Sequence, residues 1–340
     1  MVFVNFFSSP IGLGHVTRDI AIKNNFHDIT TNFVTGSGAA KILKKLEIQV
    51  NDAYSPPSFI VENGTLKSST KWLWKYYQYY KDCKKISQKI LQKDNPKAVI
   101  SDEDFASLTA AQEMKIPTIL ITDILETHFT KGLASFIEKK MNRSMLEIIK
   151  KCEVVILPEI GDSENNIQRV GPIVRQTDYT REKLREKFSF GKKTIVISIG
   201  GTDAGLFLID KALDAISKIN QDLEVILVSG PSVHKKYDNV KNLGFVENLH
   251  EIIYAADVLI SLAGKSTIDE ASAYGTPAIF IPIKGHFEQE DNAKEQGFVF
   301  EDIERLEKLI MSKLEEKRNQ INTEGAKKAA KIIQSLIDNY

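Results

Sequence analysis

The sequence predicts an α/β protein of two doubly wound domains, each with a parallel sheet covered by helices. Three observations predict it. Short, nearly continuous apolar runs recur along the whole chain, as is typical of strands that are buried on both faces. Longer stretches with helical spacing separate these runs. The length of 340 residues, at roughly 100–200 residues per domain, is enough for two domains.

Nine strands are expected from the apolar runs. In chain order they are residues 2–7, 29–34, 98–100, 118–121 and 154–157 in the first half, and residues 194–199, 224–228, 258–260 and 278–281 in the second. A helix is expected over residues 206–219, because Leu206, Ile209 and Leu213 recur at intervals of three or four. The opening apolar stretch lacks a basic region and a cleavage site, which favours a buried strand over a signal peptide.

The two halves are expected to join between residues 160 and 190. Residues 161–166 are polar and turn-rich, and a charged segment over residues 180–187 precedes the next strand. We therefore expect one domain over residues 1–171, a second over residues 172–322 and a closing helix over residues 323–340.

Composition excludes several classes of protein. The 45 Lys and Arg residues balance 45 Asp and Glu residues, which excludes a general nucleic-acid coat that binds through bulk basic charge. The longest apolar runs, such as residues 276–283, are shorter than the roughly 18 residues that a membrane span needs. Two cysteines, Cys83 and Cys152, cannot build a disulfide framework, so we expect a reducing cytoplasm.

A glycine-rich turn, Gly12-Leu13-Gly14-His15, follows the first strand. Glycines let the backbone turn tightly and let a ligand approach main-chain N–H groups, and the positive end of the next helix faces the same place. His15 adds a titratable group at the carboxyl end of a strand, where α/β folds place their chemistry. The alternative interpretation of the two glycines is a tight structural turn.

The second half opens with a similar turn, Gly200-Gly201-Thr202-Asp203, after the strand at residues 194–199. Paired glycines and a hydroxyl before a helix again suit an anionic ligand. Asp203 is interpreted either as a ligand-binding residue or as a helix N-cap.

A third turn, residues 263–267, begins another expected helix. Gly264, Ser266 and Thr267 offer main-chain and hydroxyl donors there, which predicts a phosphate site. The run resembles a P-loop, but Leu259 stands where that motif requires its first glycine, so a P-loop is excluded. Glu270 is interpreted as a carboxylate that binds ribose hydroxyls, or else as a capping or surface residue.

A series of short motifs occurs in the second half in a characteristic order. They are Gly244-Phe245-Val246, Tyr254-Ala255-Ala256-Asp257, Ala263-Gly264-Lys265-Ser266-Thr267, Glu270, Gly275-Thr276-Pro277, Gln289 and Asn292-Ala293. This pattern resembles the nucleotide-sugar half of MurG-type UDP-glycosyltransferases, which have the GT-B architecture and a C-terminal domain of the glycosyltransferase family 28 type. In the first half, the turn that ends at His15, together with Arg18, resembles the glycine loop of the same family.

The resemblance implies two Rossmann-like domains that face each other across a cleft. The first would bind the acceptor and the second the nucleotide sugar, and the closing helix would cross back to the first. The backbone at Val246 would receive uracil, and Glu270 would bind the ribose. The other implied nucleotide-sugar contacts are Gly12, Gly14, Gly201, Thr202, Gly264, Lys265, Ser266, Thr267, His286, Phe287, Glu288 and Gln289. Among them, Gly201, Thr202 and residues 265–267 would hold the diphosphate, and Glu288 and Gln289 would hold the hydroxyls of the donor sugar. Lys265 replaces a small residue of the family and is interpreted as a phosphate contact or as a solvent-facing residue.

The implied reaction is an inverting, metal-independent transfer of a sugar from a UDP-sugar to a hydroxyl acceptor. His15 would act as the general base and Asp102, just after residues 98–100, would orient it. The alternative for Asp102 is a cap of the helix that begins at Phe105. Helix N-termini would stabilise the charge of the leaving diphosphate, so neither a metal ion nor a cofactor is expected.

The acceptor side is less specific. Residues 71–85 contain Trp72, Trp74 and several tyrosines among lysines, a combination that suits lipid headgroups or a polyprenyl acceptor, or else a helix packed on its own domain. We expect a lipid, polyprenyl or glycan acceptor and no nucleic-acid partner. The expected location is the cytoplasm, with peripheral association at the inner face of the cell membrane.

Two other functions stay open. Residues 12–19 and 200–203 also resemble UDP-sugar hydrolases of the PseG type, in which His15 would activate water. A catalytically silent nucleotide-sugar-binding subunit is the third possibility. The length of the chain and the complete block over residues 289–293 favour the transferase. The motifs do not specify the donor sugar, the acceptor or the oligomeric state.

Overall fold

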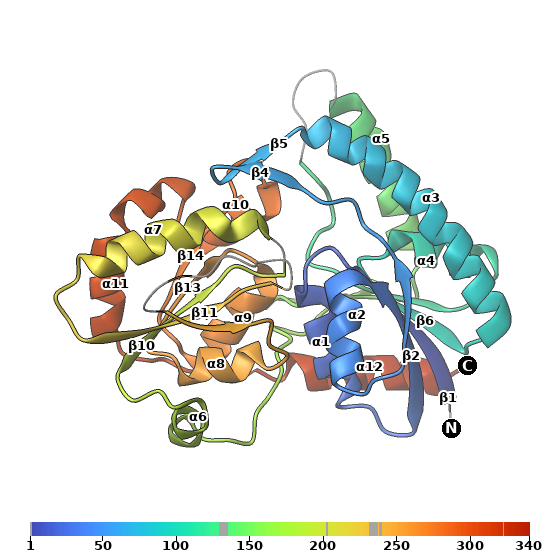
Figure 1. The fold of residues 1–340 in the computed structure, drawn as a ribbon. Helices are drawn as coiled ribbons and strands as arrows, with labels where there is room; N and C mark the ends of the chain where they lie inside the picture. The colour runs from blue at the N-terminus through green and yellow to red at the C-terminus, as the bar shows by residue number, and fades with distance from the viewer. Residues whose placement is uncertain (1, 129–134, 202, 231–236, 238–239, 322) are drawn as a thin grey trace. The chain divides into compact units, whose positions relative to one another are not determined.

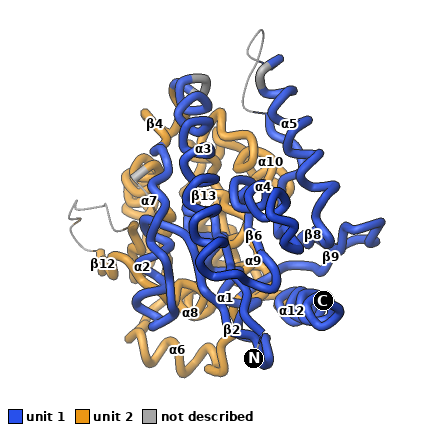
Figure 2. Tube along the Cα trace, turned by 90° about the vertical axis from the view of Figure 1, so that its right-hand side faces the viewer, with its two compact units in different colours: residues 1–58, 68–174, 323–340 blue, residues 59–67, 175–322 orange. Residues whose placement is uncertain are grey.

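The computed structural model describes residues 2–128, 135–201, 203–230, 237, 240–321 and 323–340. The chain divides into two compact units (Figure 2). Unit 1 comprises Met1–Ser58, Ser68–Val174 and Thr323–Tyr340, and unit 2 comprises Phe59–Lys67 and Arg175–Asn322. The sequence-based domain limits differ in two respects, since they place residues 59–67 in the first domain and residues 172–174 in the second.

Unit 1 is built on a parallel seven-stranded sheet in the order β3-β2-β1-β6-β7-β8-β9. Figure 1 labels its strands β1, β2 and β6. Its elements are β1 (Val2–Ser8), α1 (Gly14–Lys23), β2 (Ile29–Gly36), α2 (Ser37–Lys45), β3 (Val50–Tyr54), α3 (Ser69–Asp94), β6 (Ala98–Asp102), α4 (Phe105–Glu113), β7 (Thr118–Ile121), α5 (Ser135–Lys150), β8 (Val154–Leu157), β9 (Ile167–Arg169) and α12 (Gly325–Asp338).

The centre of this sheet is apolar because its strands are covered on both faces. Phe6 in β1 and Phe33 in β2 are fully buried and stack with their ring centroids 5.0 Å apart. The C-terminal helix α12 packs against α1, and the Gln334 side chain donates a hydrogen bond to the carbonyl of His27 (3.0 Å). Residues from the two ends of the chain therefore complete unit 1 together.

Unit 2 is built on a parallel five-stranded sheet in the order β12-β11-β10-β13-β14, with a separate two-stranded hairpin. Its elements are β4 (Ile60–Glu62), β5 (Thr65–Lys67), α6 (Arg181–Phe188), β10 (Lys193–Ser198), the 3₁₀ turn η2 (Asp203–Gly205), α7 (Leu206–Ser217), β11 (Leu223–Val228), β12 (Lys241–Gly244), α8 (Leu249–Ala255), β13 (Val258–Leu262), α9 (Lys265–Tyr274), β14 (Ala278–Ile281), α10 (Phe287–Glu295), the 3₁₀ turn η3 (Phe300–Arg305) and α11 (Leu306–Glu315).

All nine predicted strands are present, and the predicted helix over residues 206–219 is α7. The strands that the sequence did not predict are β3, β9 and β12, which are edges of their sheets, and the two strands of the hairpin. These three edge strands are partly exposed and so lack a continuous apolar run, whereas the fourth edge strand, β14, is buried and apolar. None of the described helices, including the 26-residue α3, combines the length and the hydrophobicity needed to cross a bilayer.

Candidate active site

The strand order changes direction once in each sheet, between β1 and β6 in unit 1 and between β10 and β13 in unit 2. In doubly wound sheets, ligands bind beyond the carboxyl ends of the strands at this point. The predicted turns lie there: Gly12 follows β1, Asp102 ends β6, Gly200 follows β10 and Gly264 follows β13. Each unit therefore carries its predicted glycine turns at its own switch point.

His15 and Asp102 form a hydrogen-bonded pair in unit 1. His15 Nδ1 lies 2.8 Å from Asp102 Oδ1, and the carboxylate is fully buried whereas the imidazole is 18% exposed. Because the carboxylate accepts this bond, Nδ1 carries the proton and Nε2 keeps a lone pair. Glu103 Oε2 lies 3.8 Å from Nε2. The arrangement presents an oriented imidazole that can take up a proton.

The alternative role of Asp102, as a helix cap, is wrong. Helix α4 does begin at Phe105, but its N-cap is Asp104, whose carboxylate accepts from the backbone N–H groups of Ala106 (3.1 Å) and Ser107 (3.4 Å). The Asp102 carboxylate instead pairs with His15 at the switch point.

Arg18 holds Asp102 from the other side. Its Nε donates to Oδ2 (2.5 Å), one Nη donates to Oδ1 (2.6 Å), and the other Nη donates to Asp123 (3.1 Å). Burial alone would raise the pKa of Asp102, but the charge of Arg18 and the hydrogen bonds from Arg18 and His15 outweigh it and hold that pKa at about 2. The sequence named Arg18 as part of a motif but gave it no role; its function as a buried clamp depends on contacts 84 and 105 residues away.

A third carboxyl group lies in the same cluster. Asp19 is fully buried and accepts a hydrogen bond from the hydroxyl of Ser8, the last residue of β1. Burial and the neighbouring charge of Asp102 raise the pKa of Asp19 well above its ordinary value. The cluster therefore favours the ionised form of Asp102 and the protonated form of Asp19.

In unit 2, the turn after β13 presents a helix N-terminus. Gly264 is the N-cap of α9, no side chain caps this helix, and Ser266 and Thr267 lie in its first turn. The N–H groups at such an end attract anions. Lys265 opens the helix but pairs with Asp269 (2.5 Å), and its side chain is 18% exposed.

The turn after β10 is described in part. Gly200 has φ +77°, a conformation that favours glycine, and Gly201 is half-buried. Thr202 lies outside the described residues, and so does the side chain of Asp203. Asp203 opens the 3₁₀ turn η2, and the N-cap of the following α7 is Gly205.

Glu270 is neither a cap nor a surface residue. It is 4% exposed, and its Oε1 accepts hydrogen bonds from Nε and Nη2 of the buried Arg175, both at 3.0 Å. Burial raises the pKa of Glu270, and Arg175 acts against that rise. Arg175 also donates through Nη1 to the carbonyl of Glu247 (2.5 Å), next to Val246. One guanidinium thus joins the predicted ribose carboxylate to the predicted uracil loop.

The sequence did not identify Arg175, which it treated as part of the join between the halves. A signal was available, because a lone arginine ends the apolar run over residues 170–174. Its partner, however, lies 95 residues away and is not marked by any local pattern.

The predicted nucleotide-sugar contacts over residues 286–289, which include the donor-sugar residues Glu288 and Gln289, lie at the end of the loop between β14 and α10 and in the first turn of α10. His286 is buried, and burial lowers its pKa to about 4. Gln289 Oε1 accepts from the backbone N–H of Ile283 (3.1 Å). Phe287 and Glu288 are half-buried. Asn292 donates to the carbonyl of Ala263 (3.2 Å), which ties α10 to the turn before α9.

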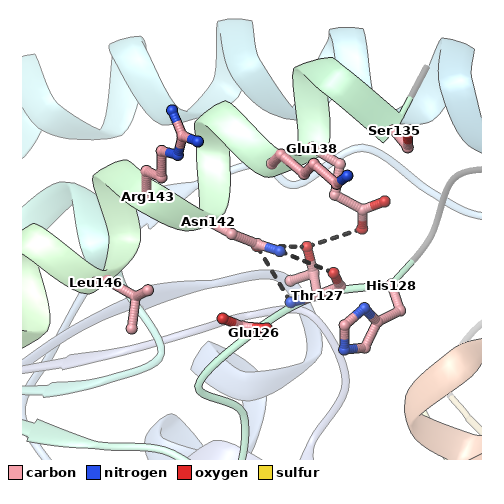
Figure 3. A pocket seen from close by; sticks show the side chains of 9 residues that line it. Glu126, Thr127, His128, Ser135, Glu138, Asn142, Arg143 and Leu146 are labelled. Atoms are coloured by element: carbon pink, nitrogen blue, oxygen red, sulfur yellow. Dashed lines mark hydrogen bonds between the residues drawn. The ribbon is translucent and has the colours of Figure 1, made fainter. Parts of the chain in front are cut away.

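Unit 1 also contains a pocket of about 370 Å³ beside α5 (Figure 3). It is lined by Glu126, Thr127, His128, Ser135, Glu138, Lys139, Asn142, Arg143 and Leu146. Thr127 Oγ1 lies 2.9 Å from both Glu138 Oε1 and Asn142 Oδ1, either of which can accept its one proton, and the Asn142 amide donates to the Thr127 carbonyl (3.0 Å). The sequence did not predict this pocket, whose residues come from a loop and a helix.

Some aromatic residues of helix α3 pack on its own unit and others are exposed, so each of the two interpretations of this segment applies to part of it. Trp72 is buried and donates to the carbonyl of Pro57 (3.1 Å). Trp74 is 66% exposed, and Tyr77 is also exposed, with the Lys81 ammonium 4.3 Å from its ring centroid. One face of the helix packs on unit 1, and the other carries aromatic and basic groups in solvent.

Two buried histidines make the stability of unit 2 depend on pH. Burial lowers the pKa of His250 to about 2 and that of His286 to about 4. Both stay neutral in the folded protein while the unfolded chain takes up protons below about pH 6.5, so stability is lost as pH falls. We expect each to contribute a slope that approaches about 1.4 kcal/mol per pH unit between about pH 6 and pH 5, and only His250 to keep that slope down to about pH 4.

Native-state hydrogen exchange of β13 amides, measured across this pH range, checks the prediction. His250→Gln is expected to flatten the slope. His27→Gln is the control, because His27 is an exposed residue of unit 1. An unchanged slope in His250→Gln would show that this imidazole becomes protonated without unfolding.

Comparison with known proteins finds a family match in the second half of the chain. Residues 194–338 match the glycosyltransferase family 28 C-terminal domain. An uncharacterized glycosyltransferase of Methanopyrus kandleri is 24% identical over 74% of this chain and 79% of its own length. The UDP-N-acetylglucosamine–N-acetylmuramyl-(pentapeptide) pyrophosphoryl-undecaprenol N-acetylglucosamine transferase of Leuconostoc citreum is 27% identical over 61% of this chain and 59% of its own length.

The fold also matches solved structures. The glycotransferase of kitacinnamycin superposes over 99% of both chains with a TM-score of 0.65 at 13% identity. That likeness supports the predicted architecture, and the family match supplies the class of enzyme. The protein is a glycosyltransferase with the GT-B fold, and its residues 194–338 match the glycosyltransferase family 28 C-terminal domain.

Proposed function

We propose that this enzyme transfers a sugar from a UDP-sugar to a hydroxyl acceptor, with inversion at the anomeric carbon and without a metal ion. The observation that carries the proposal is the buried junction at Arg175, which holds Glu270 and the carbonyl of Glu247. A carboxylate beside a loop backbone offers hydroxyl and base recognition in one place, as nucleoside sites require. The relative from Leuconostoc citreum is named for UDP-N-acetylglucosamine as donor.

The diphosphate is assigned to the turns after β10 and β13. Breaking the anomeric C–O bond builds negative charge on the leaving diphosphate and oxocarbenium character on the sugar. The N-terminus of α9, with Ser266 and Thr267 in its first turn, supplies donors for that charge. Preorganised donors of this kind stabilise the leaving group, so the proposal requires neither a metal ion nor a cofactor.

The attacking hydroxyl needs a base, and His15 is the candidate. Asp102 accepts from Nδ1, which leaves Nε2 to take the acceptor proton as the C–O bond forms. Attack by the acceptor on the face opposite the diphosphate predicts inversion in a single displacement.

The acceptor is assigned to unit 1. Its pocket beside α5 combines charged and polar groups, and the exposed face of α3 carries Trp74 and Tyr77 beside lysines. Aromatic and basic side chains together suit a lipid-linked acceptor at an anionic membrane surface. We therefore propose peripheral association with the inner face of the cell membrane.

Calorimetry with UDP tests the proposal. Glu270→Ala is expected to weaken UDP binding by about 10–100-fold, because it removes a charged acceptor for the ribose hydroxyls. Glu251→Ala is the matched control, since Glu251 is also a buried carboxylate of unit 2 but is paired with Lys187. Thermal unfolding of both variants separates lost binding from lost folding.

The outcomes of this experiment discriminate between functions. An absence of UDP affinity in the wild-type protein contradicts the proposal. Stoichiometric release of free sugar from a UDP-sugar without an acceptor indicates a hydrolase. UDP binding without turnover against a broad panel of acceptors indicates a silent binding subunit.

A further inference from the structure

The hairpin of β4 and β5 is an insertion in the sequence of unit 1 that belongs structurally to unit 2. Residues 59–67 lie between two stretches of unit 1 but pack with unit 2. The two strands pair antiparallel, and Asn63 and Gly64 form the turn with φ of +47° and +75°. Positive φ at both positions is the geometry of the tight hairpin turn that Asn-Gly favours. The hairpin is therefore well specified locally, although its place in the fold is not.

Backbone hydrogen bonds attach the hairpin to the loop between β14 and α10. The Leu66 N–H donates to the carbonyl of Lys284 (2.8 Å), and the Lys284 N–H donates to the carbonyl of Gly64 (2.8 Å). Thr65 and Lys284 form a parallel β-bridge. These hydrogen bonds join backbone to backbone, so they fix the position of the loop relative to the hairpin independently of the side chains on the loop.

The tip of the hairpin is also held by packing. Gly64 is buried, and a Cβ atom added to it would lie 2.7 Å from the ring of Phe300 and 2.9 Å from the ring of Phe207. Phe207 is in the first turn of α7 and Phe300 opens η3. Only glycine fits between the two rings at this positive φ.

The hairpin touches both of the loops assigned to the pyrophosphate and to the donor sugar. At its start, the Phe59 ring lies 5.3 Å from the ring of His286. Its first strand, β4, packs against η2, which directly follows the turn with Gly200 and Gly201. The hairpin, which is far from both loops in the sequence, therefore packs beside both of them.

The loop that the hairpin holds also sets the direction of a predicted sugar contact. The N–H of Ile283 donates to Gln289 Oε1 (3.1 Å), and the N–H of Gly285 donates to Glu290 Oε1 (2.8 Å). Lys284, which bonds to the hairpin on both sides of its peptide, lies between these two residues. A shift of the loop backbone therefore moves the amide of Gln289 with it.

We propose that the hairpin over residues 59–67 is a positioning element for recognition of the donor sugar. By fixing the loop at Lys284, it fixes the Gln289 amide and the start of α10, whereas the nucleoside is held elsewhere, at Glu270 and Val246. The inference rests on the proposed function, because it needs a nucleotide sugar in unit 2. It predicts that damage to the hairpin lowers affinity for the sugar part of the donor more than affinity for UDP.

Gly64→Ala tests this, with Gly297→Ala as the matched control. Gly297 has φ +79°, nearly the same as Gly64, but a Cβ atom there meets nothing within 4 Å. The two variants therefore share backbone strain, and only Gly64→Ala forces the hairpin away from Phe207 and Phe300. Calorimetry is done first on the wild-type protein with UDP, UDP-glucose, UDP-galactose, UDP-N-acetylglucosamine and UDP-glucuronic acid, to find the sugar nucleotide that binds most tightly.

For that sugar nucleotide, the ratio of its affinity to that of UDP is expected to fall about tenfold in Gly64→Ala, the cost of one to two lost hydrogen bonds, and to stay within about twofold in Gly297→Ala. Hydrogen exchange at the amides of Leu66, Lys284 and Ile283 is expected to accelerate at least about tenfold in Gly64→Ala only. Thermal unfolding reports whether the fold as a whole survives.

Three results would overturn the inference. The first is an unchanged affinity ratio in Gly64→Ala with accelerated exchange, which would show that the loop does not depend on the hairpin to bind the sugar. The second is a parallel loss of UDP and sugar-nucleotide affinity, which would indicate a general effect on unit 2. The third is a wild-type protein that binds UDP as tightly as every sugar conjugate. A wild-type protein that does not bind UDP at all overturns the proposed function itself, and the inference with it.

Discussion

His15→Ala is expected to lower the rate of sugar transfer by about 10²–10⁴-fold, the usual contribution of a general base, while affinity for the UDP-sugar stays within about twofold. The physical reason is that Nε2 is the only ring atom left to accept a proton, because Nδ1 is engaged with Asp102. His15 belongs to unit 1, whereas the nucleotide contacts proposed here are carried mainly by unit 2. Steady-state rates and donor binding, measured on the same preparation, check both parts.

His27→Ala is a suitable control for this variant, since it removes an exposed imidazole of the same unit. A His15→Ala enzyme that transfers sugar at the normal rate would contradict the assignment. The next candidate base would then be Glu103, whose carboxylate lies 3.8 Å from His15 Nε2.

Arg18→Ala is expected to lower the free energy of unfolding of unit 1 by about 3–5 kcal/mol, because breaking a buried ion pair leaves the partner charge uncompensated. Arg18 is 3% exposed and binds Asp102 with two hydrogen bonds and Asp123 with one. Without the guanidinium, the buried Asp102 and the half-buried Asp123 lose their cation, which in the wild-type protein holds the pKa of Asp102 at about 2.

Tryptophan fluorescence in urea measures this loss directly. The two tryptophans of the chain, Trp72 and Trp74, both lie in unit 1, so their signal reports on that unit. Arg169→Ala is the control, because Arg169 lies in the same unit but forms a partly exposed ion pair with Glu159 (3.5 Å). Exposed ion pairs contribute about 0–1 kcal/mol to the free energy of unfolding. A loss below about 1 kcal/mol for Arg18→Ala would mean that the carboxyl groups relieve the defect by taking up protons.

The ion pair between Arg18 and Asp102 also makes the stability of unit 1 depend on pH. The pKa of Asp102 is lowered on folding, so its ion pair stabilises unit 1 above the pKa of an unfolded Asp, near 3.9, and that stabilisation is lost as pH falls toward about 2. The difference in unfolding free energy between the wild-type protein and Arg18→Ala is therefore expected to shrink over this range.

The sequence was informative wherever structure depends on neighbouring residues. Continuous apolar runs identified the buried strands from β1 to β14, because a strand between two helical layers needs apolar side chains on both faces. Glycines after β1, β10 and β13 identified the turns at the switch points, since those turns need a flexible backbone. The pairing of His15 with a carboxylate after residues 98–100 followed from the family pattern.

What only the tertiary structure decided are contacts between residues far apart in the chain. The edge strands β3, β9 and β12 are defined by their neighbours and not by their own burial. The roles of Arg18 and Arg175 depend on carboxylates 84 and 95 positions away. The Asn63-Gly64 turn could have been read locally as a hairpin, but its membership of unit 2 could not. Local patterns record burial and backbone freedom, whereas the partner of a buried charge or of a hairpin is chosen when the chain has folded.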